Sequence, residues 1–382
     1  MSAAEERKSL PALIEEAQRL LAICNACRYC EGYCAVFPAL QRRLAFPEHD
    51  VHYLANLCHN CGACHHACQY APPHPFDLNF PRTLARVREQ TYRKYAWPGA
   101  FASLYDRNAL AVALASFAGI AFMFLLAAFL SDPARLFQAH ADAKGSFYAL
   151  IPHGTMVAVF GTVSAFVAAA FAVGIARFWP DMGERLADFV RPSTAAEALH
   201  DAFTLRWLDG GEDKQGCRHP DEPPSNARRV FHHLTFYGFL LCFAATSLAS
   251  VYHYAFGWKA PYAFLSLPVV LGTVGGIGLI AGPLGLLSLR RRRDPELMAP
   301  EQKGMDEGFL ALLVATSVTG LALLFLRETA AMGTLLCLHL GAVLALFLTM
   351  PYGKFAHAIY RVVALVRFHL ERRRPVAFSL PE

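Results

Sequence analysis

The chain carries two runs of four cysteines, CNACRYCEGYC at residues 24–34 and CHNCGACHHAC at residues 58–68. In each run, two, two and then three residues separate successive cysteines. This is the spacing of bacterial ferredoxins, in which three cysteines hold one [4Fe–4S] cluster and the fourth ligates the other. The runs therefore predict a double-cluster domain. One cluster would be bound by Cys24, Cys27, Cys30 and Cys68, and the other by Cys58, Cys61, Cys64 and Cys34.

The alternative reading of the same cysteines is two zinc sites with four thiolates each. Zinc ribbons use paired CxxC units rather than triple ones, so the spacing favours iron–sulfur clusters. In ferredoxins a proline directly follows the fourth cysteine, whereas Pro38 and Pro72 here come four residues later. The pattern therefore specifies the clusters more strongly than it specifies which cysteines share one. Because eight thiolates already complete two clusters, we expect His59, His65 and His66 to lie beside them without ligating iron.

The composition separates this chain from an ordinary soluble enzyme. Of its 382 residues, 55% are apolar and 17% are charged, whereas an average soluble domain carries about 25% charged residues. The formal net charge of +5 gives no support for a basic nucleic-acid-binding protein. Eight of the 11 cysteines lie in the first 68 residues, and the charged residues at positions 1–20 argue against a secretory signal. We therefore expect reduced, metal-bound cysteines in the cytosol.

Six stretches lack Asp, Glu, Lys and Arg and are long enough to cross a bilayer, which takes about 20 apolar residues. They are residues 109–131, 145–176, 234–258, 260–289, 309–326 and 329–353. Glycines between residues 272 and 282 of the fourth stretch would allow close helix packing. In the cysteine domain, apolar spacing predicts short helices at about residues 10–21 and 48–57.

These observations predict a mainly α-helical protein in three parts. A ferredoxin-like double-cluster domain would occupy residues 1–108, a six-helix transmembrane bundle residues 109–360, and a tail residues 361–382. Lys and Arg are enriched before the first span, in the long connection at 177–233, in Arg290–Arg293 and in the tail. Because cytoplasmic loops carry the excess of Lys and Arg, both termini and the clusters should face the cytoplasm, as in a bacterial-type inner membrane.

Histidines within the spans are the second candidate site, because a polar residue in the bilayer is costly and points to function. The third span begins with His232 and His233 and ends near His253, and the last carries His339 and is followed by His357. Eighteen residues separate His339 from His357. At about 100° per residue this is five turns, so we expect both histidines on one helical face, about 27 Å apart along the axis.

The third and sixth spans run antiparallel, which would bring these histidines together at two depths. Either His232 or His233 would meet His357 near the cytoplasm, and His253 would meet His339 toward the outer side. Paired histidines on facing helices suit bis-histidine ligation of b-type haem, and the pattern predicts one or two haems. The alternative is that the end histidines are interfacial and that haem is absent.

A motif at the start of the third span, RRVFHHLTFYGF at residues 228–239, carries a family resemblance. With the double cysteine run and the Pro and Gly pattern of residues 262–285, the chain resembles the tricarballylate/citrate-utilisation protein B family over nearly its whole length. The segment from His339 to His357, with Pro351, Tyr352, Lys354 and Phe355, is similar to the last haem helix of nitrate-reductase gamma-type cytochromes b.

The resemblance implies a membrane electron-transfer subunit, an oxidoreductase component without its own substrate chemistry. Its partner would be a soluble FAD-dependent dehydrogenase of tricarballylate or a similar tricarboxylate, whose reduced flavin it reoxidises. Electrons would pass through two [4Fe–4S] clusters and b haem to quinone in the lipid bilayer. No nucleic acid would be bound.

Two other functions fit parts of the pattern. A tricarboxylate transporter is conceivable, but no span holds a charged residue in its middle and a carrier does not need clusters. A heterodisulfide-reductase-like enzyme usually needs cysteines beyond the eight, and Cys217 is the only such candidate on the expected side. His153, early in the second span, is a reserve haem ligand or a quinone-site residue.

Overall fold

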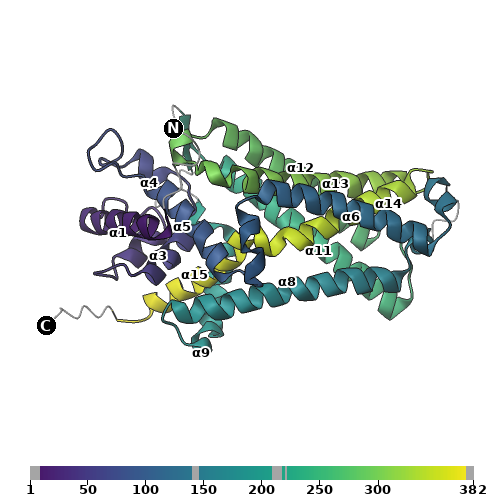
Figure 1. Cartoon of the computed structure of the whole chain (residues 1–382), viewed down its shortest axis with the longest axis horizontal. Helices are drawn as coiled ribbons and strands as arrows, with labels where there is room; N and C mark the ends of the chain where they lie inside the picture. Colours follow the sequence, from purple (N-terminus) through teal and green to yellow (C-terminus); the bar gives the residue numbers. More distant parts are fainter. Residues whose placement is uncertain (1–8, 140–145, 209–216, 220–221, 376–382) are drawn as a thin grey trace.

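A computed structural model describes residues 9–139, 146–208, 217–219 and 222–375 of the chain. The described part is mainly α-helical, as predicted. A domain of shorter helices lies at one end, on the left in Figure 1, and long helices extend from it side by side.

The cysteine domain consists of α1 (Leu10–Cys27), α2 (Val36–Leu40), α3 (Glu48–Leu57), α4 (Ala63–His66) and α5 (Phe80–Tyr95). Helix α1 buries Leu13, Ile14, Ala17, Leu20 and Leu21, which follow helical spacing in the sequence. The helix predicted at residues 48–57 is α3. Both helix predictions are confirmed, and the two helices pack around α5 to form the core beside the cysteines.

In the described residues, six helices are long and apolar enough to cross a membrane. They are α6 (Asn108–Leu130), α8 (His153–Asp181), α11 (Ala227–Phe256), α12 (Leu267–Arg292), α13 (Lys303–Leu326) and α14 (Met332–Thr349). The predicted six-span bundle is therefore confirmed, and the chain is a multi-pass membrane protein.

Short elements connect these helices. They are η1 (Gly99–Tyr105), η2 (Pro133–Phe137), α7 (Ser146–Leu150), α9 (Leu186–Phe189), α10 (Pro192–Thr204), η3 (Arg206–Leu208), β1 (Cys217–His219), β2 (Glu222–Ser225), η4 (Pro295–Leu297) and η5 (Pro300–Gln302). Strands β1 and β2 pair antiparallel. Residues 209–216 and 220–221 of the long predicted connection lie outside the described residues.

Helices α11 and α12 pack backbone against backbone. A Cβ atom added at Gly238 would lie only 2.9 Å from the carbonyl oxygen of Gly275, and one added at Gly282 would lie 2.6 Å from the amide nitrogen of Thr235. Any larger residue would force the helices apart. The glycines of the fourth span thus serve the close packing expected from the sequence.

The last span differs from the expected single helix. Helix α14 ends at Thr349, a 3-10 turn η6 (Met350–Tyr352) follows, and α15 (Ala356–Arg372) starts afresh. Pro351 and Gly353 stand at this break, and proline cannot continue the hydrogen bonding of a helix. His339 and His357 therefore lie on different helices, and the prediction that they share one helical face is corrected.

Helix α15 spans much of the segment predicted as a tail. It extends from the end of the bundle into the cysteine domain (yellow in Figure 1) and packs against α3 and α10. Its residues 363–371 are buried. The Nε2 atom of His369 lies 3.0 Å from a carboxylate oxygen of Asp201 in α10. Apolar residues between 363 and 370 are thus part of the core of the cysteine domain.

Candidate metal centres

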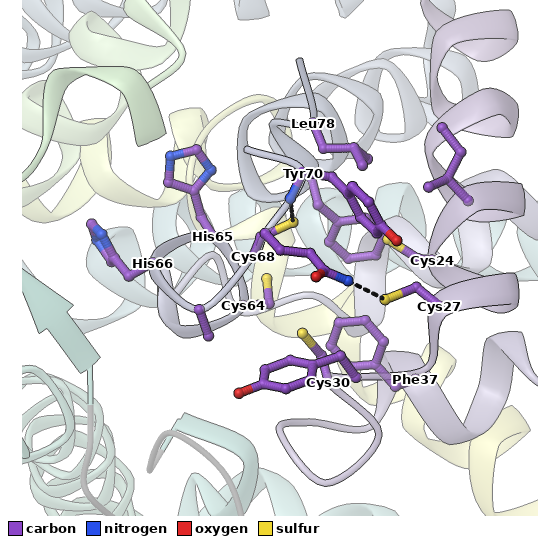
Figure 2. Close-up of a pocket in the computed structure, with 15 residues that line it drawn as sticks. Cys24, Cys27, Cys30, Phe37, Cys64, His65, His66, Cys68, Tyr70 and Leu78 are labelled. Atoms are coloured by element: carbon purple, nitrogen blue, oxygen red, sulfur yellow. Dashed lines mark hydrogen bonds between the residues drawn. The ribbon is translucent and has the colours of Figure 1, made fainter. Parts of the chain in front are cut away.

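The first cysteine site is a cavity of about 310 Å³ beside α1. Figure 2 shows the thiols of Cys24, Cys27, Cys30 and Cys68 gathered around it, with Cys64 at its inner edge. The backbone amide of Tyr70 donates to the sulfur of Cys68 at 3.4 Å. These four cysteines are the set predicted for one cluster, and we call this set the cluster I site.

The second cysteine site adjoins the first. A smaller cavity is lined by Cys34, Cys58, Cys61 and Cys64, which are the predicted second set and are called the cluster II site. Cys64 lines both cavities. The backbone amide of Asn60 donates to the sulfur of Cys58 at 3.3 Å. The structure thus brings each predicted set together, although the fourth cysteine of each set comes from the other run.

The electrostatics of the thiols fit a metal cluster at each site. Burial, and then the neighbouring sulfur of Cys30, raise the pKa of Cys24 to about 12. Burial, followed by Cys61, Cys58 and Cys34, raises the pKa of the Cys64 thiol well above its ordinary value. Crowded thiols resist ionisation, and bound metal reverses this because thiolates are its ligands. The donor set of four sulfurs at each site suits a [4Fe–4S] cluster.

The three histidines of the second run do not join these cavities as ligands. His59 donates through Nδ1 to the carbonyl of Leu57 at 3.1 Å. His65 and His66 line the wall of the first cavity, but their rings point away from the sulfurs in Figure 2. Burial, and then the charges of Arg361 and Arg228, lower the pKa of His59 well below its ordinary value. It is a neutral imidazole beside the cluster II site.

A pair of histidines lies between the bundle and the cysteine domain. The rings of His232 in α11 and His357 in α15 are 6.0 Å apart between centroids, with their planes at 84°. His233, the other candidate, contacts Tyr237 instead, with ring centroids 5.6 Å apart. The structure therefore selects His232 as the residue that faces His357.

The spacing of His232 and His357 would allow the two imidazoles to hold a haem iron between them. Metal–nitrogen bonds of about 2 Å on opposite faces of an iron would separate the two ring centroids by roughly 6 Å. His357 donates through Nδ1 to the carbonyl of Lys354, which leaves Nε2 for a metal. The buried Nδ1 of His232 has no hydrogen-bond partner. Near the pair, Nε and one terminal nitrogen of Arg361 are also buried without hydrogen-bond partners.

The outer pair is different from the predicted one. His253 stacks on His153 of α8, with ring centroids 3.6 Å apart and planes at 14°, and Tyr148 packs edge-on against both rings. His339 instead has its Nδ1 3.0 Å from the carbonyl oxygen of Thr316 in α13. No contact joins His253 and His339 in the described part of the chain. Stacked rings at 3.6 Å leave no room for an iron between them, so this pair does not fit a second bis-histidine haem.

Helix packing explains why the outer pairing differs. Helix α11 packs mainly on α12, whereas α14 packs on α6 and α13. The third and sixth spans therefore do not face each other along their whole length. The continuation of the sixth span, α15, instead brings His357 to α11, and α8 brings His153 to the other end of α11.

Comparison with known proteins places the chain in a family. Residues 17–101 match the model of the Fer4-like domain of citrate utilization protein B, and residues 103–378 match the model of citrate utilization protein B itself. The chain belongs to the citrate utilization protein B family. Citrate utilization protein B of Escherichia coli is 50% identical over 369 residues, which are 97% of this chain and 95% of the relative. No solved structure matches the chain. The family resemblance read from the sequence is confirmed.

In this family member, sequence reasoning missed two features of the site. One is the break at η6, for which Pro351 and Gly353 were a readable signal. The other is a group of arginines that bind the backbone of the cluster II site. Arg228 belongs to the motif at residues 228–239. Neither its charge nor its position in the sequence indicates that it binds the backbone carbonyls of His59 and Asn60.

Proposed function

We propose that this chain is a membrane electron-transfer subunit that reoxidises the flavin of a separate FAD-dependent dehydrogenase and delivers the electrons to quinone. The substrate of that dehydrogenase would be tricarballylate or a similar tricarboxylate. The name of the Escherichia coli relative, citrate utilization protein B, agrees with this substrate class. The clusters and haem, when bound, supply one-electron carriers between a two-electron donor and a two-electron acceptor.

One observation carries the proposal: two sets of four cysteines and the His232–His357 pair follow one another through the molecule. The cavities of the cluster I and cluster II sites adjoin, because Cys64 of the cluster II site lines both. The loop of the cluster II site is hydrogen-bonded to Arg228 and Arg361, and each arginine stands one helical turn from a histidine of the His232–His357 pair. A transporter does not need such a series, and a heterodisulfide-reductase-like enzyme usually needs cysteines beyond the eight.

The overall reaction balances without another co-reactant. Reduced flavin releases two electrons and two protons as it returns to FAD. Quinone takes up two electrons and two protons to become quinol. The role of this chain is to hold one-electron carriers in series, to exclude water from the inner sites and to orient the ligands of the carriers.

We place the cysteine domain on the cytoplasmic side of a bacterial-type inner membrane. The Lys and Arg distribution supports this orientation, because the arginine-rich ends of α12 and α15 lie toward the cysteine domain (Figure 1). A soluble dehydrogenase would then reach the cluster I site from the cytoplasm.

Analysis of the anaerobically purified full chain tests the cofactor content. We expect about eight iron atoms and eight acid-labile sulfides per chain from two clusters, and in addition a b-type haem by the pyridine haemochrome assay. Stoichiometric zinc without labile sulfide would overturn the proposal.

A second experiment tests the direction of electron flow. The chain in proteoliposomes with a quinone should be reduced by the dehydrogenase and its tricarboxylate substrate, and quinol should form. Cys24→Ser, which removes a ligand of the cluster I site, should abolish this reaction. Quinol formation that persists at the wild-type rate in Cys24→Ser, or substrate uptake in the absence of the dehydrogenase, would contradict the proposed function.

A further inference from the structure

The backbone between Cys58 and Asn60, next to the cluster II site, is held by arginines from four separate helices or helix ends. Among the described residues, Arg361 donates to the carbonyl of Cys58 at 2.7 Å, and Arg88 donates to the same oxygen. Arg228 donates to the carbonyl of Asn60 at 2.6 Å, and Arg293 donates to that oxygen at 2.6 Å. These four side chains are called the arginine clamp.

Two arginines of the clamp are in register with the histidine pair. Arg228 precedes His232 by four residues in α11, and Arg361 follows His357 by four residues in α15. Residues four apart lie on the same side of a helix, about one turn from each other. Each helix therefore presents a histidine to the opposite histidine and an arginine to the cluster II loop. Arg88 and Arg293 bind the same loop, but no histidine of the pair lies on their helices.

Three of the four arginines in the clamp lack a carboxylate partner among the described residues. Within the described part of the chain, Arg88, Arg228 and Arg361 form no ion pair with a carboxylate. Burial, and then the nearby charge of Arg88, lower the pKa of Arg361. Its Nε and one terminal nitrogen are buried without hydrogen-bond partners. Cationic nitrogens that are buried without a counterion are costly, as are those of Arg88 and the inner nitrogens of Arg361, so this region favours an anion. A [4Fe–4S] cluster bound by four thiolates is one, and the carboxylates of a haem are another.

We propose that Arg228 and Arg361 are positioning residues that fix the distance between the cluster II site and the His232–His357 pair, and that their charge raises the reduction potential of the cluster held at the cluster II site. This inference rests on the proposed function. The positive charges stabilise the reduced cluster, which carries one more electron than the oxidised cluster. The hydrogen bonds from one turn of α11 and one turn of α15 hold the loop at a fixed height above the histidines.

The test compares variants of the two classes of clamp residue in the purified full chain. Arg361→Gln and Arg228→Gln remove a charge and a link to the histidine pair. Arg88→Gln and Arg293→Gln are matched controls, because they remove a charge from the same loop without that link. Two quantities are measured for each: the midpoint potential of the cluster at the cluster II site, by an electron paramagnetic resonance titration, and the rate of haem reduction after rapid reduction of the clusters.

All four Gln variants should lower the potential of this cluster. The expected change is on the order of tenfold in the ratio of reduced to oxidised cluster at a fixed poise, which is 59 mV for a one-electron couple. Only Arg361→Gln and Arg228→Gln should also slow haem reduction, by about tenfold, because a lower cluster potential alone favours electron transfer to haem. Arg361→Lys should keep the potential near the wild-type value, because it keeps the charge.

Two outcomes would overturn the inference. The first is that the cluster at the cluster II site keeps the wild-type potential in Arg361→Gln, which would show that the charge of Arg361 does not raise this potential. The second is that haem reduction is slowed equally in the Arg88 and Arg293 variants, which would show that Arg228 and Arg361 have no particular role in fixing the distance to the histidine pair. A wild-type chain that holds no haem or no clusters would instead contradict the proposed function, so the two failures are distinguishable.

Discussion

The imidazole of His232 faces that of His357 at 6.0 Å between ring centroids, at the junction of the membrane bundle and the cysteine domain. The two residues are brought together because α15 starts in a new direction after η6 and continues into the cysteine domain. The same helix therefore supplies a histidine to the bundle and a buried apolar face to the domain that holds the cysteines. Disruption of α15 would affect both parts of the molecule.

Removal of either histidine of this pair should remove the haem. We expect His357→Ala and His232→Ala to contain less than about a tenth of the wild-type haem, because a single remaining imidazole leaves one axial position without its ligand. The pyridine haemochrome assay measures this, and iron and labile sulfide should stay at the cluster level. His233→Ala is the matched control and should keep its haem. Full haem content in His357→Ala would show that the ligands lie elsewhere.

The outer histidines should not be needed for haem binding. His339 is held by the carbonyl of Thr316, and His253 is stacked on His153. We therefore expect His339→Ala and His253→Ala each to keep the wild-type haem content and the same reduced-minus-oxidised spectrum. A loss of about half of the haem in either variant would reveal a second haem and would restore the pairing expected from the sequence.

The crossed arrangement of the cysteines can be tested one ligand at a time. Cys34 lies with Cys58 and Cys61 rather than with the rest of its own run. Cys34→Ser should therefore change the paramagnetic signal of the cluster nearer the haem and slow haem reduction. Cys68→Ser should change the signal of the other cluster and block its reduction by the dehydrogenase. If the two variants exchanged these effects, each cluster would be held by the four cysteines of a single run.

Local patterns in the sequence predicted much of the fold, because spacing and hydropathy are local properties. The stripe of Leu13 to Leu21 specifies α1, and the uncharged stretches specify the six spans. The neighbours of each span could not be predicted in the same way. Hydropathy does not show that α14 packs on α6 and α13 rather than along α11. The predicted pairing of His253 with His339 assumed that α11 and α14 are neighbours, and His253 instead stacks on His153 of α8.

In the candidate site, the sequence predicted the cysteine sets but not the arginine contacts. Repetition of one cysteine spacing was sufficient to indicate both sets of four thiols. The partners of Arg228 and Arg361 could not be predicted, because their hydrogen bonds join residues 168 and 303 positions apart in the chain. Every residue has a backbone carbonyl, so the sequence does not mark which one a distant arginine binds. The helical spacing of four between Arg228 and His232 is visible in the sequence, but its meaning needs the position of the loop.

Acid should weaken the cysteine domain through His52. This side chain is fully buried between α3 and α5, with Nδ1 2.8 Å from the hydroxyl of Thr91 and Nε2 3.3 Å from Glu48. Burial, and then the charge of Lys94, lower the pKa of His52 to about 4, although Glu48 opposes the shift. The unfolded chain takes up this proton near pH 6.5, so the unfolded state binds more protons than the folded state between pH 6.5 and about 4.

The free energy of unfolding should therefore decrease by about 3 kcal/mol in total as the pH falls from 6.5 to about 4. Above pH 6.5, His52 should not affect it. The urea concentration that removes half of the cluster absorbance, measured in the full chain at pH 7 and pH 5, reports the change. His52→Gln cannot take up the proton, so the difference between the two pH values should shrink. His49→Gln, at a half-buried position of the same helix, should keep the wild-type difference. An undiminished difference in His52→Gln would assign the acid sensitivity to the cysteine ligands themselves, since protonation of thiolates also releases metal.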